Sequence, residues 1–160
     1  MWFTRTGRGY SWGARDRATT GRGAGRSRAL MNPARIETVQ WAYPGSPVAA
    51  RDARRRLAAQ LQTWQVNAAD AESVLLVAHE LVTNAVEHAR TPFELTVSFD
   101  KTAVLVEVSD ESTLLPDLQP LNLRAARGRG LQMVAALAKS WNWISHSGGK
   151  TIRAVIVPES

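Results

Sequence analysis

One helix-forming segment of the chain reads Ala78-His79-Glu80-Leu81-Val82-Thr83-Asn84-Ala85-Val86-Glu87-His88. In a helix of 3.6 residues per turn, Glu80 and Asn84 lie one turn apart, at about 40° from each other around the axis. The apolar residues gather on the other side, so the helix has a core face and a polar face, and both side chains belong to the polar face. Two interpretations follow: a solvated surface, or a site that orients a nucleophile and holds a divalent cation through oxygen ligands.

The segments around this helix predict an α+β fold, a two-layer sandwich with helices on one face of a mixed β-sheet. Ser46 and Asn67 are the predicted N-caps of two helices, which run to about Trp64 and to near Arg90. The remaining elements are predicted from periodicity: strands at Ile36–Trp41, Glu94–Phe99, Ala103–Ser109, Trp141–His146 and Thr151–Val157, and a third helix at Leu131–Lys139. The long irregular stretch from Glu111 to Arg127 is predicted to be a functional loop or lid.

The positive charge of the chain is concentrated at its N-terminus. The net charge is +6, and residues 1–31 hold seven of the 20 basic residues but one of the 14 acidic residues, together with six of the eleven glycines. We expect a disordered Arg/Gly-rich tail or a start codon assigned too early, because Met31 opens a segment of ordinary globular composition. Residues 32–160 are expected to form one domain. The basic and acidic residues of this domain are equal in number, so the domain lacks the excess positive charge that is typical of nucleic-acid-binding proteins. The Arg/Gly-rich tail, in contrast, is of a kind that can bind RNA.

The composition excludes several classes of protein. The chain has no cysteine, which removes disulfides, thiolate metal sites and cysteine catalysis. No apolar run approaches the roughly 20 residues of a membrane span. The first residues also lack the apolar core of a secretory signal. These observations predict a soluble cytoplasmic protein that does not associate with a membrane.

Two further features suggest that the polar helix face is a site. Asp110 ends a predicted strand, where its carboxylate can accept a hydrogen bond from an exocyclic amine such as that of adenine. Gly128-Arg129-Gly130 opens a helix, where backbone N–H groups and the helix dipole favour phosphate and glycine permits a close approach. Each feature is weak alone, but their order and their spacing from Glu80 and Asn84 are much less common.

These motifs together resemble the GHKL ATP-binding fold of gyrase, histidine kinases and the heat-shock chaperones of ninety kilodaltons. His79–Ala85 resembles its N box, Val106–Asp110 its adenine-reading G1 strand, Gly128–Leu131 its G2 glycine box, and Gly149-Lys150-Thr151 its closing strand. The resemblance covers roughly residues 36–157. It is greatest to the anti-sigma regulatory factor and serine-protein kinase family, whose actinobacterial members are often single-domain proteins.

The resemblance implies that the chain binds ATP with Mg²⁺ and assigns roles to four side chains. Glu80 would be the general base, which orients the hydroxyl or water that attacks the γ-phosphate. Asn84 would hold Mg²⁺, which bridges the phosphates. Asp110 would read the adenine amine, with help from the Thr151 hydroxyl.

The glycine box is implied to close over the phosphates. Gly128 and Gly130 would let the loop approach the nucleotide, with Arg129 as a phosphate contact and Leu131 continuing the motif. The chain departs from the family pattern at Ser112, where the G1 box commonly has a glycine that turns the chain beneath the base. This departure leaves the adenine affinity and the turnover open.

The implied function is that of an ATP-binding anti-sigma regulatory factor. It would act as a serine/threonine-protein kinase that phosphorylates an anti-sigma antagonist and thereby leaves a sigma factor sequestered. Both the sigma factor and the antagonist are therefore expected protein partners, and a homodimer is a further expectation because the family often pairs. The alternative is a docking module of the same fold without kinase activity. A third hypothesis is a nucleic-acid-binding protein that acts through its arginine tail.

Overall fold

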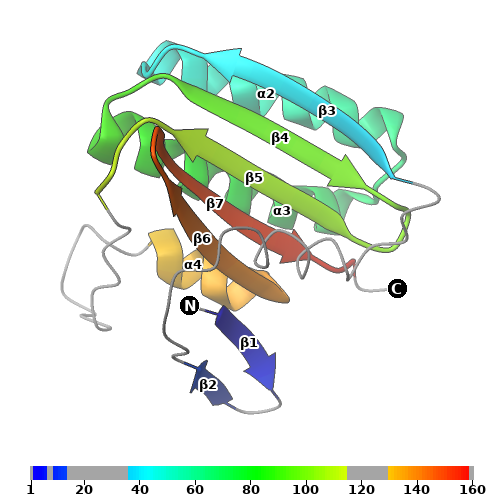
Figure 1. Ribbon diagram of the computed structural model, residues 1–160. Coiled ribbons are helices and arrows are strands. Elements are labelled where there is room, and N and C mark those ends of the chain that lie inside the picture. The colour runs from blue at the N-terminus through cyan, green and yellow to red at the C-terminus, as the bar shows by residue number, and fades with distance from the viewer. Residues whose placement is uncertain (1, 7–8, 14–35, 115–129, 159–160) are drawn as a thin grey trace, which may run out of the picture.

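The computed structural model describes residues 2–6, 9–13, 36–114 and 130–158, which build two layers. The helices α2 (Pro47–Thr63), α3 (Ala68–Thr83) and α4 (Gly130–Leu137) cover one face of a seven-stranded sheet (Figure 1). The strands are β1 (Trp2–Thr6), β2 (Gly9–Gly13), β3 (Glu37–Tyr43), β4 (Phe93–Phe99), β5 (Val104–Asp110), β6 (Ser140–His146) and β7 (Gly149–Ile156). The predicted α+β sandwich is confirmed.

Both predicted helix caps are present. The Ser46 hydroxyl accepts from the Ala49 N–H at 3.2 Å, and Pro47 occupies the first position of α2. The Asn67 side chain accepts from the Asp70 N–H at 3.0 Å and begins α3. These bonds satisfy backbone donors that have no partner within the helix, and this is why short polar residues mark the helix starts so reliably.

The sheet is antiparallel at each pair of strands, so the predicted mixed sheet is wrong. The strand order is β2-β1-β6-β7-β5-β4-β3. Two helices, α2 and α3, connect β3 to β4. The chain runs along the sheet in one direction in α2 and returns in α3, so β4 pairs antiparallel with β3. The α4 crossover does leave β5 and β6 running in the same direction, but β7 lies between them and pairs antiparallel with both.

The N-terminal residues also differ from the expectation. Trp2–Thr6 and Gly9–Gly13 form a pair of antiparallel strands, and β1 continues the sheet by pairing with β6. Disorder was expected for all of residues 1–31, and it does not hold for these two segments. Aromatic residues favour strands, and an average over a tail rich in Gly and Arg hides two short aromatic segments. The remainder of that range lies outside the described residues, and a start at Met31 stays a prediction.

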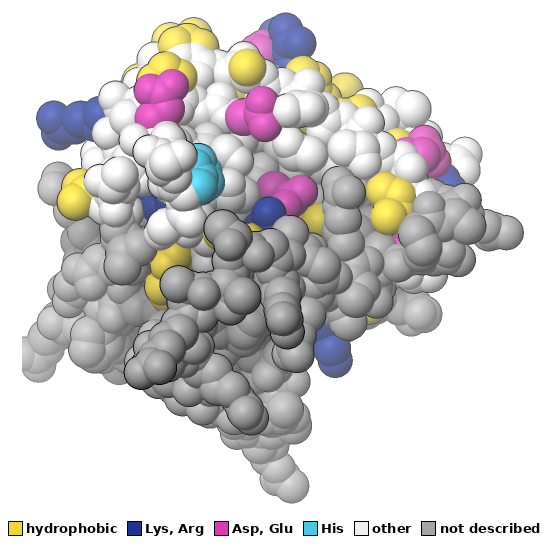
Figure 2. Space-filling view, viewed as in Figure 1, with side chains coloured by type: hydrophobic (Ala, Val, Ile, Leu, Met, Phe, Trp, Pro, Cys, Tyr) yellow, Lys and Arg dark blue, Asp and Glu magenta, His cyan; other side chains and the backbone are white. Residues whose placement is uncertain are grey.

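Side chains alternate between the two faces of the central strands. The face toward the helices is the core, and it contains Val104, Val106 and Val108 of β5 and Ile152, Ala154 and Ile156 of β7. The outer face carries polar groups as well as apolar ones, including an ion pair of 2.8 Å between Arg153 and Glu107. Figure 2 shows basic and acidic side chains interspersed among the described residues on this side of the molecule. None of the described helices is long and apolar enough to cross a membrane.

Candidate functional site

Glu80 and Asn84 lie at the C-terminal end of α3, and both side chains are half-buried. The Asn84 N–H donates to the Glu80 carbonyl oxygen, so the two residues are one α-helical turn apart, as the sequence predicts. From Asn84 to Ala89 the chain is wound as a π-helix, η2, and it ends at Arg90 in the left-handed conformation, with φ 56°. Single π turns within helices are rare and are frequent at functional sites.

The start of α4 contacts the Glu80 carboxylate. A Cβ atom built on Gly130 would lie 2.3 Å from Glu80 Oε2, closer than non-bonded atoms come. Leu131 is buried in the core beside it, which fixes the first turn of the helix. The structure therefore brings together the predicted base, Glu80, and the last glycine of the predicted glycine box, Gly130. Gly128 and Arg129 lie outside the described residues, as does most of the predicted lid.

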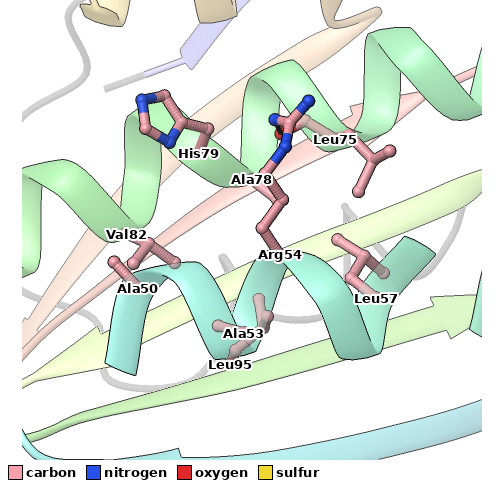
Figure 3. A pocket seen from close by; sticks show the side chains of 9 residues that line it. All are labelled: Ala50, Ala53, Arg54, Leu57, Leu75, Ala78, His79, Val82 and Leu95. Carbon is pink, nitrogen blue, oxygen red and sulfur yellow. Dashed lines mark hydrogen bonds between the residues drawn. The ribbon is translucent and has the colours of Figure 1, made fainter. Parts of the chain in front are cut away.

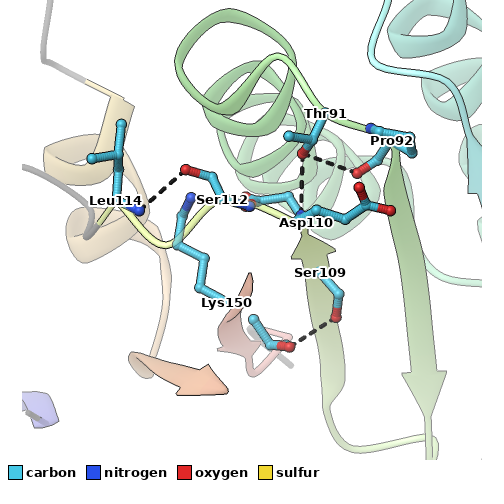
Figure 4. Close-up of polar contacts among 9 residues, drawn as sticks. Thr91, Pro92, Ser109, Asp110, Ser112, Leu114 and Lys150 are labelled. Carbon is cyan, nitrogen blue, oxygen red and sulfur yellow. Dashed lines mark hydrogen bonds and ion pairs between the residues drawn. The ribbon is translucent and has the colours of Figure 1, made fainter. Parts of the chain in front are cut away.

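Asp110 ends β5 on the helix-facing side of the sheet and is almost completely buried. Its Oδ1 atom accepts from the Lys150 ammonium at 2.9 Å and from the Ser112 N–H at 2.9 Å (Figure 4). Gly149, with φ +141°, lies so close that a Cβ there would be 1.9 Å from the Asp110 carbonyl oxygen. The absence of a side chain at Gly149 thus allows the start of β7 to pack directly against the backbone at the end of β5.

The structure does not bring Thr151 together with Asp110. The register pairs Asp110 with Lys150 and Ser109 with Thr151. The Thr151 and Ser109 hydroxyls lie 2.8 Å apart, and strand alternation places them on the outer face of the sheet. Lys150 is therefore the side chain beside Asp110 that sequence reasoning missed. Its only sequence signal was its position inside the glycine-rich closing motif, one residue before the threonine.

Ser112 replaces the glycine of the family pattern without strain. Its φ is not positive, so the backbone here does not require glycine. Its hydroxyl accepts from the Leu114 N–H at 3.2 Å, and its own N–H binds Asp110. The turn beneath Asp110 is thus held by side-chain hydrogen bonds of the kind that short polar residues make.

Thr91 joins the end of η2 to the end of β5. Its hydroxyl accepts from the Glu111 N–H at 3.1 Å (Figure 4). A Cβ on Gly45 would lie 2.3 Å from the Thr91 carbonyl oxygen. The helix that carries Glu80 and the strand that carries Asp110 are therefore connected at one end of the sheet. His88 and Arg90 are exposed at the end of η2.

The described part of the chain also contains a shallow crevice, which lies between α2 and α3. Figure 3 shows its lining, which is apolar apart from Arg54 and His79. Arg54 donates to the Leu75 carbonyl oxygen at 3.3 Å and so bridges the two helices. The crevice lacks the polar groups that a nucleotide would need, so we assign it no role.

The donor set suits a cation that is bound together with phosphates. Among the described residues no group of three or more His, Cys, Asp or Glu could hold a metal. Mg²⁺ characteristically takes one or two protein oxygens and completes its shell with water and substrate phosphates. The Asn84 carboxamide, half-buried one turn from Glu80, provides such an oxygen.

Residues 43–156 match the family model of the histidine kinase-like ATPase domain. The chain belongs to this family. Among curated proteins, no sequence matched the chain significantly. Two solved structures share the fold of this histidine kinase-like ATPase domain at low sequence identity.

The first is the crystal structure of the RsbU and RsbW domains of Rv1364c from Mycobacterium tuberculosis, with 20% identity and a TM-score of 0.60. That match covers 76% of this chain and 32% of the other, so this chain spans about a third of that protein. The second is the SiaB–SiaC complex from Pseudomonas aeruginosa, with 16% identity, a TM-score of 0.60, and coverage of 84% and 95%. At these identities the likeness establishes the fold alone.

Proposed function

We propose that the chain binds MgATP and transfers its γ-phosphoryl group to a serine or threonine of a protein antagonist, as an anti-sigma regulatory factor. The observation that carries this proposal is the contact between Gly130 and the Glu80 carboxylate. The N-terminus of a helix can bind a phosphate group through its free N–H groups. If the start of α4 holds the γ-phosphate in this way, the Glu80 carboxylate lies beside that phosphate and can accept a proton from the attacking hydroxyl. A merely solvated glutamate needs no such neighbour.

In this mechanism Glu80 orients the substrate hydroxyl and accepts its proton. The hydroxyl oxygen forms a bond to the γ-phosphorus while the bond to the β–γ bridging oxygen breaks, and ADP leaves. Bound Mg²⁺ would neutralise the charge on the phosphates. Asn84 is the residue that would hold it, and the N–H groups at the start of α4, near Gly130, would bind the phosphate oxygens. Asp110 would accept from the adenine amine at the far end of the nucleotide.

The proposed partners are a sigma factor, which the protein would sequester, and its antagonist, which the protein would phosphorylate. Support comes from family membership and from the fold shared with an RsbW domain and with SiaB, which was solved in complex with SiaC. The alternative is a docking module without kinase activity. The ion pair between Asp110 and Lys150 is the observation on its side, because it engages Oδ1 and leaves only Oδ2 of that carboxylate for an adenine amine.

Two measurements test the proposal. Calorimetry with MgATP should show binding to the wild type that weakens about tenfold or more in Asn84→Ala and in Asp110→Asn, since each loses a hydrogen bond or ligand to a charged group. Unchanged affinity in both variants would refute the nucleotide site.

Radiolabel transfer from ATP to candidate antagonists should fall about 100- to 10,000-fold in Glu80→Gln. Glu87→Gln is the matched control, because that glutamate is exposed further along the same helix and should transfer normally. If wild type binds ATP and labels no antagonist, the docking module is the correct function.

A further inference from the structure

Lys150 and Asp110 form a charged pair inside an otherwise apolar surface. The other helix-facing residues of β5 and β7 are aliphatic and belong to the core. The Lys150 and Asp110 side chains are only 3% and 1% exposed, and Nζ lies 2.9 Å from Oδ1. The pair occupies the end of the core nearest the proposed site, where β5 finishes and β7 starts.

Stability does not explain such a pair. Removing two charges from water costs several kcal/mol per ion, and hydrophobic residues of similar volume are often as stable or more so. The pair also has unused capacity. An ammonium has three N–H donors, and among the described residues the Lys150 ammonium donates a hydrogen bond to Oδ1 of Asp110 alone. The Ser112 N–H also donates to Oδ1, and no described residue donates a hydrogen bond to the second carboxylate oxygen, Oδ2.

The position of Lys150 is fixed by the backbone. The register sets Lys150 directly opposite Asp110, and the close approach of Gly149 to the Asp110 carbonyl oxygen leaves no space for a shift. Two N–H donors and one carboxylate oxygen are thus held side by side at a buried end of the sheet. This is an adjacent donor and acceptor, which matches one edge of a heteroaromatic base.

We propose that Lys150 is a base-specifying residue that donates a hydrogen bond to N1 of adenine while Asp110 Oδ2 accepts from the N6 amine. This inference rests on the proposed ATP site and adds a second contact to it. Adenine presents an acceptor, N1, beside a donor, N6, and the pair offers the complementary groups. Guanine presents the reverse order, an acceptor at O6 and a donor at N1, so the pair discriminates against it.

The test compares ATP with 1-deaza-ATP, in which a C–H group replaces N1 and the amine is retained. Calorimetry on the full chain should show 1-deaza-ATP binding the wild type about 10- to 100-fold more weakly than ATP, the range for a hydrogen bond from a charged donor. In Lys150→Met the two nucleotides should bind equally. In Lys150→Gln, which keeps a neutral donor, part of the difference should persist.

Two controls keep the outcomes distinct. Lys139→Met removes an exposed lysine and should leave the difference between the nucleotides intact. Thermal unfolding monitors the fold of each variant, and if Lys150→Met fails to fold, the wild type and Lys150→Gln still decide.

Equal binding of ATP and 1-deaza-ATP by the wild type overturns the inference. So does a difference that is undiminished in Lys150→Met, or tighter binding of GTP than of ATP. In each of these cases ATP still binds and the proposed function survives. Absence of ATP binding to the wild type overturns both.

Discussion

A methyl group on Gly130 would lie 2.3 Å from Oε2 and 3.3 Å from Cδ of Glu80, so the start of α4 rests directly on that carboxylate. Two elements far apart in the sequence, a helix at residues 68–83 and a helix that starts at residue 130, meet at this contact. The relationship makes the position of the carboxylate depend on the size of the residue opposite it, and a single substitution can test that dependence.

Gly130→Ala should impair phosphoryl transfer without unfolding the protein. The new methyl group meets the end of a flexible side chain, so Glu80 can rotate away at little cost, and alanine is the better helix former by about 1 kcal/mol. A displaced base costs on the order of 100-fold in rate. Radiolabel transfer should therefore fall about 100-fold, while the melting temperature stays equal or rises.

Gly148→Ala is the matched control for this prediction. A Cβ atom at Gly148 would meet only His146 Nδ1, at an ordinary 3.8 Å. That variant should transfer label like the wild type. Full activity in Gly130→Ala would show that Glu80 does not need its observed position.

Gly149→Ala should destabilise the fold strongly. The φ of +141° is unfavourable for any residue with a Cβ, and this Cβ would lie 1.9 Å from the Asp110 carbonyl oxygen, which belongs to the backbone and cannot rotate away. We expect the free energy of unfolding to fall by about 3 kcal/mol. Urea denaturation against Gly148→Ala measures the difference, and a variant as stable as that control would contradict the close approach.

Ser112→Gly should not improve ATP binding, although it restores the residue that the family pattern prefers. The φ of Ser112 is not positive, so glycine brings no relief of strain. The substitution removes the acceptor of the Leu114 N–H and adds freedom to the unfolded chain, each at a cost of about 1 kcal/mol. A tenfold gain in affinity by calorimetry would mean that the serine does weaken adenine binding.

Thr151→Val should lower stability by about 1 kcal/mol through loss of its hydrogen bond with Ser109, and should leave the ATP affinity within about twofold. The reason is that Thr151 lies on the outer face, away from Asp110. Ser109→Ala removes the same bond from the other side and should behave alike. If only Thr151→Val weakens ATP binding, then Thr151 contacts the nucleotide after all.

The local features of this fold were readable from the sequence, and the pairings of distant strands were not. Ser46 and Asn67 cap their helices through hydrogen bonds to residues three positions away, so a short stretch of sequence is enough to predict each helix start. The place of β7 beside β5 depends on pairings between residues 40 to 52 positions apart. The mixed sheet was predicted from the order of elements along the chain, which does not reveal such pairings.

The site shows the same division. Glu80 and Asn84 were found because both lie on one helix, whose period is fixed. Thr151 was placed beside Asp110 from the resemblance of the closing motif. Consecutive residues of a strand face opposite sides, so one position of register exchanges Thr151 with Lys150. Only the strand pairing reveals which of the two meets Asp110.

The place of β7 has a consequence for how the protein is made. β7 is the last strand of the described chain to leave the ribosome, yet it fills a gap in the interior of the sheet. Until it emerges, β5 and β6 each present an open edge, which is the kind of surface that recruits other chains. The nascent protein therefore has a period of vulnerability to aggregation that ends when β7 pairs. The same event brings Lys150 to Asp110, so the proposed adenine contact would form only after β7 has emerged and paired.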